Sequence, residues 1–157
     1  GKVDMLKICR DKWNKNSKKL ENTLRYDSKL NSYDYAKLVE ITFDIIFNDD
    51  SNEYGEDLNV ALITEIDNGD YQGTLLYLIP FETYQPSEYQ YLMTYVGYGT
   101  CSGCDTLESI RAYGDYDNFA TEKQLKDYMM LCKDIITNTI KPYNYGWRSD
   151  ERYEVIE

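Results

Sequence analysis

The 157-residue sequence predicts a single α+β domain, residues 1–157, in which an antiparallel sheet of three or four strands packs with about four helices. Two observations carry this prediction. Apolar residues recur at helical spacing near both ends of the chain, whereas between residues 58 and 96 they form short β-like runs. Asn68-Gly69 lies between two of these runs and is a strong hairpin signal, which favours antiparallel pairing.

Two helices are expected in the first part of the chain, at residues 3–25 and 33–48. In the first, Cys9 belongs to an apolar stripe and should face the core. The lysines expected off this stripe are Lys12, Lys15, Lys18 and Lys19. Residues 1–30 therefore form a basic helical segment. We expect its basic surface to contact either the acidic remainder of the chain or an external anionic ligand. Asn31-Ser32 is the predicted N-cap of the second helix.

Three strands are expected at residues 58–66, 73–79 and 89–96. In the third, Tyr89, Tyr91, Met93 and Tyr95 alternate with other residues and therefore share one face. If exposed, this tyrosine face would be a binding surface, because tyrosine supplies amphipathic contact area at a low entropic cost. The alternative is that helices cover it.

The last part of the chain, residues 101–157, predicts two helices followed by an irregular tail. Asp105 and Glu108 have the spacing of a capping box for a helix at 105–112, and Thr121 and Gln124 have it for a helix at 121–140. The second helix carries an apolar stripe that includes Cys132. The tail is aromatic and charged, with a short candidate strand at 153–156.

Charge is distributed unevenly along the chain. The total is −11, with +5 in residues 1–30, −12 in residues 31–100 and −4 in the remainder. Direct nucleic-acid binding is disfavoured, because Lys and Arg contacts with phosphates supply most of that affinity. The acidic segment predicts either a solvated surface or a face for a protein partner with a basic surface. The candidate partner-binding residues are Asp49, Asp50, Glu53, Glu56, Asp57, Tyr89 and Tyr91.

The chain contains no histidine, which excludes Ser-His-Asp and Cys-His catalysis and every His-ligated metal site. A non-enzymatic role is therefore favoured. No run approaches the roughly 18 consecutive apolar residues of a membrane-spanning helix, and the charged N-terminal segment does not resemble a signal peptide. We therefore expect a cytoplasmic protein without a membrane partner; the sequence leaves homo-oligomerisation open.

The candidate site is the glycine-rich turn between the third strand and the helix at 105–112. Gly97, Gly99 and Gly103 have the outline of a phosphate-binding turn for a nucleotide or signalling molecule, in which small residues allow close approach and helix amides face the anion. Arg111 could add a positive charge. Against this hypothesis, Asp105 stands where the anion would bind.

The same turn contains two closely spaced thiols. Cys101 and Cys104 have the CxxC spacing of a dithiol redox site. A four-cysteine zinc site would also need Cys9 and Cys132, one from each of two helices. A third interpretation is structural: the glycines serve backbone geometry and the cysteines pack as small apolar groups, so that no cofactor is required.

The run Tyr98-Gly99-Thr100-Cys101-Ser102-Gly103-Cys104-Asp105-Thr106-Leu107 resembles a YG-[ST]-CSGCD-x-L signature of small uncharacterised proteins carried by bacteriophages and prophages. The match covers about ten of the 157 residues. The resemblance implies a phage-type accessory protein located in the host cytoplasm, without an assigned chemistry. Small acidic phage proteins are frequently inhibitors of host machinery, including anti-defence and anti-CRISPR proteins.

Overall fold

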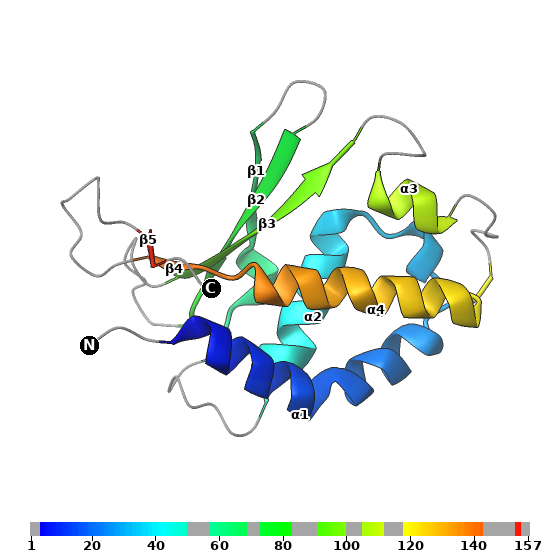
Figure 1. Ribbon diagram of the computed structural model, residues 1–157, viewed down its shortest axis with the longest axis horizontal. Coiled ribbons are helices and arrows are strands. Elements are labelled where there is room, and N and C mark those ends of the chain that lie inside the picture. The colour runs from blue at the N-terminus through cyan, green and yellow to red at the C-terminus, as the bar shows by residue number, and fades with distance from the viewer. Residues whose placement is uncertain are drawn as a thin grey trace.

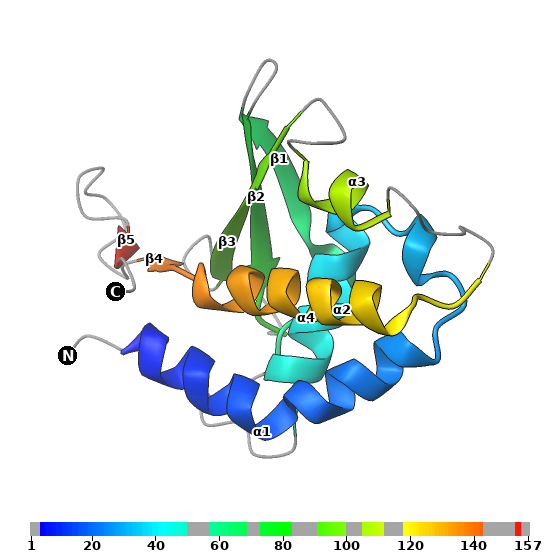
Figure 2. The same ribbon diagram turned by 45° about the vertical axis from the view of Figure 1, so that its right-hand side comes forward.

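The computed structural model describes residues 4–49, 57–68, 73–82, 91–99, 105–111, 118–141 and the backbone of 142 and 153–154. Within these residues, four α-helices accompany a three-stranded antiparallel sheet, so the predicted α+β fold is confirmed. The helices lie to one side of the sheet in Figure 1 and remain there in the turned view of Figure 2.

Helix α1 (Met5–Arg25) begins at Asp4, whose carboxylate accepts a hydrogen bond from the backbone N–H of Lys7 at 3.1 Å. Cys9 is fully buried, as predicted. The expectation that Lys12 lies off the buried stripe is wrong, because Lys12 and Asn16 both point inward. The Lys12 ammonium donates to the carbonyl of Phe47 at 3.3 Å, near the C-terminal end of the next helix. A helix C-terminus carries partial negative charge, which makes this position favourable for a cation.

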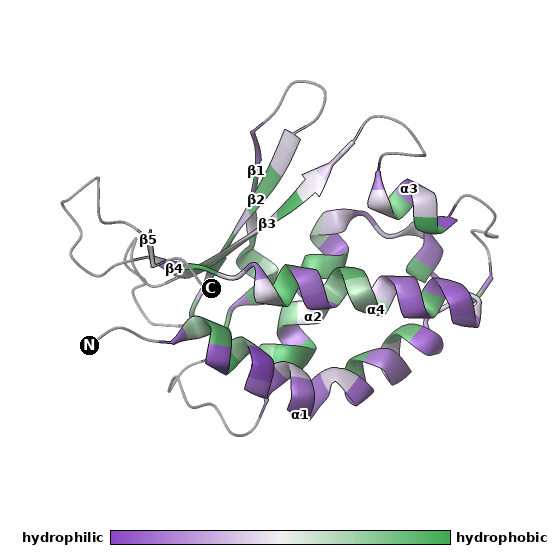
Figure 3. Cartoon of the chain, in the orientation of Figure 1, coloured by the Kyte–Doolittle hydropathy of each residue, from purple (hydrophilic) through white to green (hydrophobic). Residues whose placement is uncertain are grey.

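Helix α2 (Tyr35–Phe47) is capped by Asp34, which accepts from the backbone N–H of Lys37 at 2.9 Å. The predicted cap at Asn31-Ser32 is wrong, since these residues belong to the short 3₁₀ helix η1 (Leu30–Ser32). Most of α2 is hydrophobic, whereas α1 and α4 alternate hydrophilic and hydrophobic residues (Figure 3). The largely hydrophobic surface of α2 is typical of a helix that other elements enclose on several sides.

The sheet has the order β1-β2-β3, with β1 (Thr64–Asn68), β2 (Gly73–Pro80) and β3 (Tyr91–Tyr98). The predicted β1–β2 hairpin pairing is confirmed. However, the first strand begins at Thr64 and not at Leu58, because residues Val60–Leu62 form the 3₁₀ helix η2. Leu58 forms only an isolated antiparallel bridge with Phe81, and its backbone N–H and C=O bond to the Asn48 side chain at 2.7 and 2.8 Å.

The two faces of the sheet differ in what covers them. The buried side chains of Tyr77, Thr94 and Val96 belong to the helix-side face, where the Thr94 hydroxyl donates to the carbonyl of Ile135 at 2.6 Å. Met93 and Tyr95 belong to the opposite face, where Tyr95 is exposed. The helices therefore do not cover the predicted tyrosine face at Tyr95.

Helix α3 (Thr106–Arg111) follows Asp105, and helix α4 (Glu122–Thr137) begins with the predicted capping box of Thr121 and Gln124, both halves of which are present. Helix α4 ends before residue 140 because Ile140 pairs with Met93 through two backbone hydrogen bonds of 2.9 and 2.7 Å. The chain then forms β4 (Lys141–Pro142), which pairs with β5 (Tyr153–Glu154). Among the described residues, no helix has the length and apolar character needed to cross a membrane.

Alkaline pH is expected to destabilise the fold through the two buried thiols. Burial raises the pKa of Cys9 to about 12 and that of Cys132 to about 11, from an ordinary value of 9.0. These contributions to stability are complete below pH 9.0 and are lost as pH rises toward the folded pKa values. The free energy of unfolding should therefore fall by about 1.4 kcal/mol per pH unit for each thiol in that window.

Urea titrations at a series of alkaline pH values measure this decline. The double variant Cys9→Ala, Cys132→Ala is the matched comparison, because it keeps the buried tyrosines that also titrate at high pH. Its stability should decline less steeply than that of the parent. Equal slopes would show that the thiols do not ionise on unfolding.

Candidate functional site

The structure describes both ends of the predicted glycine-rich turn. Gly97 lies within β3, and the space where its side chain would stand is open. The backbone N–H of Gly99 donates to the Asp105 carboxylate at 3.3 Å. Gly103, Cys101 and Cys104 lie outside the described residues, so the anion, redox and zinc hypotheses that depend on them remain predictions.

Asp105 joins the end of the sheet to two helices. One carboxylate oxygen accepts from the Tyr35 hydroxyl at 2.8 Å and from Gly99, and the other accepts from the backbone N–H of Glu108 at 3.1 Å. The last bond confirms Asp105 as the predicted cap of α3. Burial, together with the hydrogen bond to Asp105, raises the pKa of Tyr35 to about 12, so the hydroxyl remains a donor at neutral pH.

Arg111 is held by bonds within the chain. Its Nε donates to the Tyr128 hydroxyl at 2.8 Å, and one terminal nitrogen donates to the carbonyls of Leu30 and Tyr33. The Arg111 guanidinium also lies over the Tyr128 ring, 5.7 Å from its centroid. Arg111 therefore ties α3 to η1 and α4, a role that the predicted contact with an anion did not anticipate.

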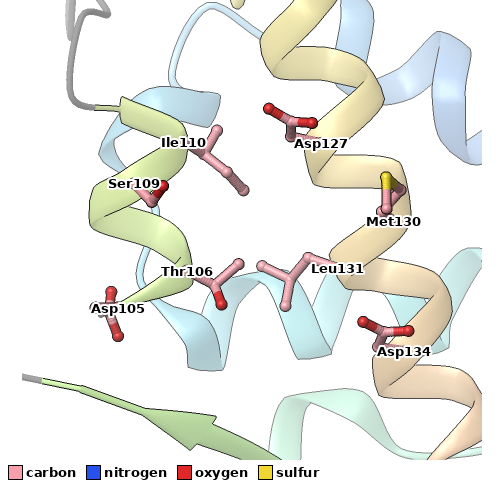
Figure 4. Close-up of a pocket in the computed structure, with 8 residues that line it drawn as sticks. All are labelled: Asp105, Thr106, Ser109, Ile110, Asp127, Met130, Leu131 and Asp134. Atoms are coloured by element: carbon pink, nitrogen blue, oxygen red, sulfur yellow. The ribbon is translucent and has the colours of Figure 1, made fainter. Parts of the chain in front are cut away.

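A groove of about 390 Å³ lies between α3 and α4 (Figure 4). Its walls come from α3 on one side and from successive turns of α4 on the other. The lining residues are Asp105, Thr106, Ser109, Ile110, Asp127, Met130, Leu131 and Asp134. Asp105, the buried cap of α3, therefore also lines the groove. In the sequence, Asp105 directly follows the glycine-rich turn.

The groove combines carboxylates with apolar surface. Three of its eight lining residues are aspartates and none is a base. Asp127 pairs with the exposed Lys123 at 3.1 Å, and such a surface pair contributes little to stability and is readily exchanged. Ile110 and Leu131 supply apolar area between the aspartates. Lys and Arg side chains have an apolar stem and a cationic head, so this arrangement suits them.

The groove residues on α4 were missed by the sequence analysis. Asp127, Met130 and Asp134 follow one another at spacings of three and four, directly beside the buried stripe. This spacing puts them on one side of the helix. What lies opposite them is decided by the position of α3, and the sequence pattern of α4 carries no information about that position.

Three of the predicted partner-binding residues, Asp49, Asp57 and Tyr91, belong to the part of the chain that the structure describes. Asp49 is mostly buried and bonds to Lys12 at 3.0 Å, to Lys15 at 3.6 Å and to the Asn16 amide at 2.8 Å. The expected contact between the basic helix and the acidic segment is therefore made within the chain. Asp57 and Tyr91 are half-buried. Asp50, Glu53, Glu56 and Tyr89 lie outside the described residues.

The part of the chain that the structure describes contains no group of three or more metal-ligating side chains. Cys9 and Cys132 are free, buried cysteines. Because burial raises the pKa of both thiols, it disfavours the thiolates that zinc requires.

The fold and the groove together define an α+β protein with helices on one face of a small sheet and an acidic groove between two of those helices. Comparisons with models of known families, with curated proteins and with solved structures found no match to this chain.

Proposed function

We propose that this chain is a non-enzymatic binding protein whose acidic surface engages a basic region of a protein partner. The observation that carries the proposal is the groove between α3 and α4, whose lining contains three aspartates and no base. The −12 charge of residues 31–100 supports it, because a field of this sign steers basic surfaces toward the molecule.

The groove would accept a Lys or Arg side chain of the partner. The carboxylates of Asp127 and Asp134 would bond the cationic head, while Ile110 and Leu131 would contact the stem. Asp105 is already engaged by three hydrogen bonds, so it would contribute mainly to the local potential. The resemblance of residues 98–107 to a signature of phage proteins suggests a biological setting: the partner would be a host protein, and binding would inhibit it in the host cytoplasm.

A short arginine-rich peptide with blocked ends tests the groove. Titrated into isotopically labelled protein, it should shift the amide resonances of Thr106, Ser109, Asp127 and Asp134. Asp134→Asn should weaken binding by about threefold, which is the size expected for one partly exposed ion pair. Affinity should also fall as salt concentration rises, because ions screen exposed charges.

The matched control is Asp11→Asn, which makes the same charge change on an exposed residue of α1, far along the chain from the groove. Asp11→Asn should leave peptide affinity nearly unchanged. Equal losses in the two variants would mean that only the total charge matters. Salt-independent binding would contradict the electrostatic basis of the proposal.

A further inference from the structure

Strand β1 is the open edge of the sheet. It pairs with β2 on one side, and within the described residues nothing pairs with its other side. All five of its residues, Thr64–Asn68, are exposed. An edge strand presents unpaired backbone N–H and C=O groups, which can bind an extended segment of another chain.

The face of the sheet away from the helices carries an exposed apolar row that ends at this edge. Ile66, Leu76 and Tyr95 are direct cross-strand neighbours in the order β1, β2, β3. Ile66 is 43% exposed and Tyr95 is 40% exposed, so the row is accessible to solvent. A strand added beside β1 would extend the row with whichever side chain it placed opposite Ile66.

The other face of the same edge carries two fixed carboxylates. Glu65 accepts from the Tyr77 hydroxyl at 2.6 Å, and Asp67 accepts from the Tyr98 hydroxyl at 2.7 Å. Tyr77 lies on the adjacent strand β2 and Tyr98 lies on β3, and each holds its acid at a defined position along the edge. Among the described residues no cation pairs with either acid. The residues of an added strand opposite Glu65 and Asp67 would therefore need positive charge.

These observations argue against a second copy of this chain as the occupant. An antiparallel pair of β1 strands centred on Ile66 would place Glu65 of each copy opposite Asp67 of the other. Shifting the pair by two residues would place identical acids opposite each other. Like charges at directly opposed positions are destabilising, and the net charge of −11 on each copy adds to the repulsion.

We propose that β1 binds an extended strand of a basic partner in which cationic and apolar residues alternate. Its Lys or Arg residues would face Glu65 and Asp67, its apolar residue would join the row of Ile66, Leu76 and Tyr95, and its backbone would pair with the edge. This inference rests on the proposed function in that the partner is basic, but it concerns a different surface from the groove.

The probe is a blocked peptide in which Lys and Val alternate. Its first control has the same composition with the lysines and valines in separate blocks, and its second is the alternating peptide N-methylated along one edge. The alternating peptide should shift the resonances of Thr64–Asn68 and slow amide exchange there. Both controls should bind at least about tenfold more weakly, since they lose the facing pattern or the backbone bonds.

Protein variants locate the contact. Ile66→Asn should weaken the alternating peptide by about tenfold through loss of the apolar row. Glu65→Gln combined with Asp67→Asn keeps the shape of the edge and should weaken the peptide by about fivefold. This second variant carries the test if Ile66→Asn disturbs the fold. The matched control is Asp11→Asn combined with Glu40→Gln, which makes the same charge change on α1 and α2, outside both proposed sites, and should leave this affinity nearly unchanged.

The outcomes separate the inference from the proposed function. If the peptide shifts only groove resonances, or binds equally well in alternating and block order, the β1 site is overturned and the groove proposal stands. If neither peptide class binds at either surface, both fail. Dimerisation of the free protein through β1, seen by sedimentation and by protection of the β1 amides, would overturn the choice of occupant.

Discussion

Asp49→Asn is expected to lower the free energy of unfolding by about 3 kcal/mol, because it leaves a buried ammonium without its counter-charge. The Lys12 side chain is only 5% exposed, and that of Asp49 is 11% exposed. Lys12 would keep its bond to the Phe47 carbonyl, which does not neutralise it. Urea unfolding at neutral pH, followed by circular dichroism, measures the loss.

Two comparisons identify the cause. Asp11→Asn removes an ion pair with Lys7 in which both side chains are more than half exposed, and it should cost less than about 1 kcal/mol. Adding Lys12→Met to Asp49→Asn removes the stranded charge and should restore part of the lost stability. A double variant no more stable than Asp49→Asn alone would contradict this explanation.

Asp105→Ala is expected to destabilise the protein by about 3 kcal/mol and to loosen α3. The substitution removes the cap of α3 and leaves the buried Tyr35 hydroxyl without its acceptor. Because α3 is one wall of the groove, binding of the arginine-rich peptide should weaken as well. Urea unfolding gives the stability, and amide hydrogen exchange in Thr106–Arg111 reports the local loosening.

Asp105→Asn separates the cap from the charge. The amide oxygen can still accept from Glu108 or from Tyr35, so the loss should be about half that of Asp105→Ala. If Asp105→Ala left exchange in α3 unchanged, the role of Asp105 in joining α3 to the sheet would be refuted.

The local signals in the sequence were reliable where short-range chemistry decides the outcome. The capping box of Thr121 and Gln124, the cap at Asp105 and the antiparallel β1–β2 pairing all follow from bonds between residues close in sequence, and all three are confirmed. The buried position of Cys9 was also predictable, because helical spacing alone assigns it to the apolar stripe.

The sequence failed where a distant partner changes the environment of a residue. Lys12 was expected at the surface, since spacing along one helix cannot show that Phe47 and Asp49 stand opposite it. Arg111 was expected to serve an anion, but the carbonyls of Leu30 and Tyr33 take its donors. Leu58 was expected in a strand, but it forms only an isolated bridge with Phe81, and both of its backbone groups bond to the Asn48 side chain.

By itself, the sequence determined the α+β class, the excess of negative charge and the cap at Asp105. Only the tertiary structure decided which acids are available to a partner. It neutralises Asp49 with α1, uses Asp105 to join α3 to the sheet, and leaves Asp127 and Asp134 in the groove and Glu65 and Asp67 at the sheet edge. The reason is physical: the charge of a side chain is fixed by its chemistry, but its availability depends on neighbours that only the folded chain brings within bonding distance.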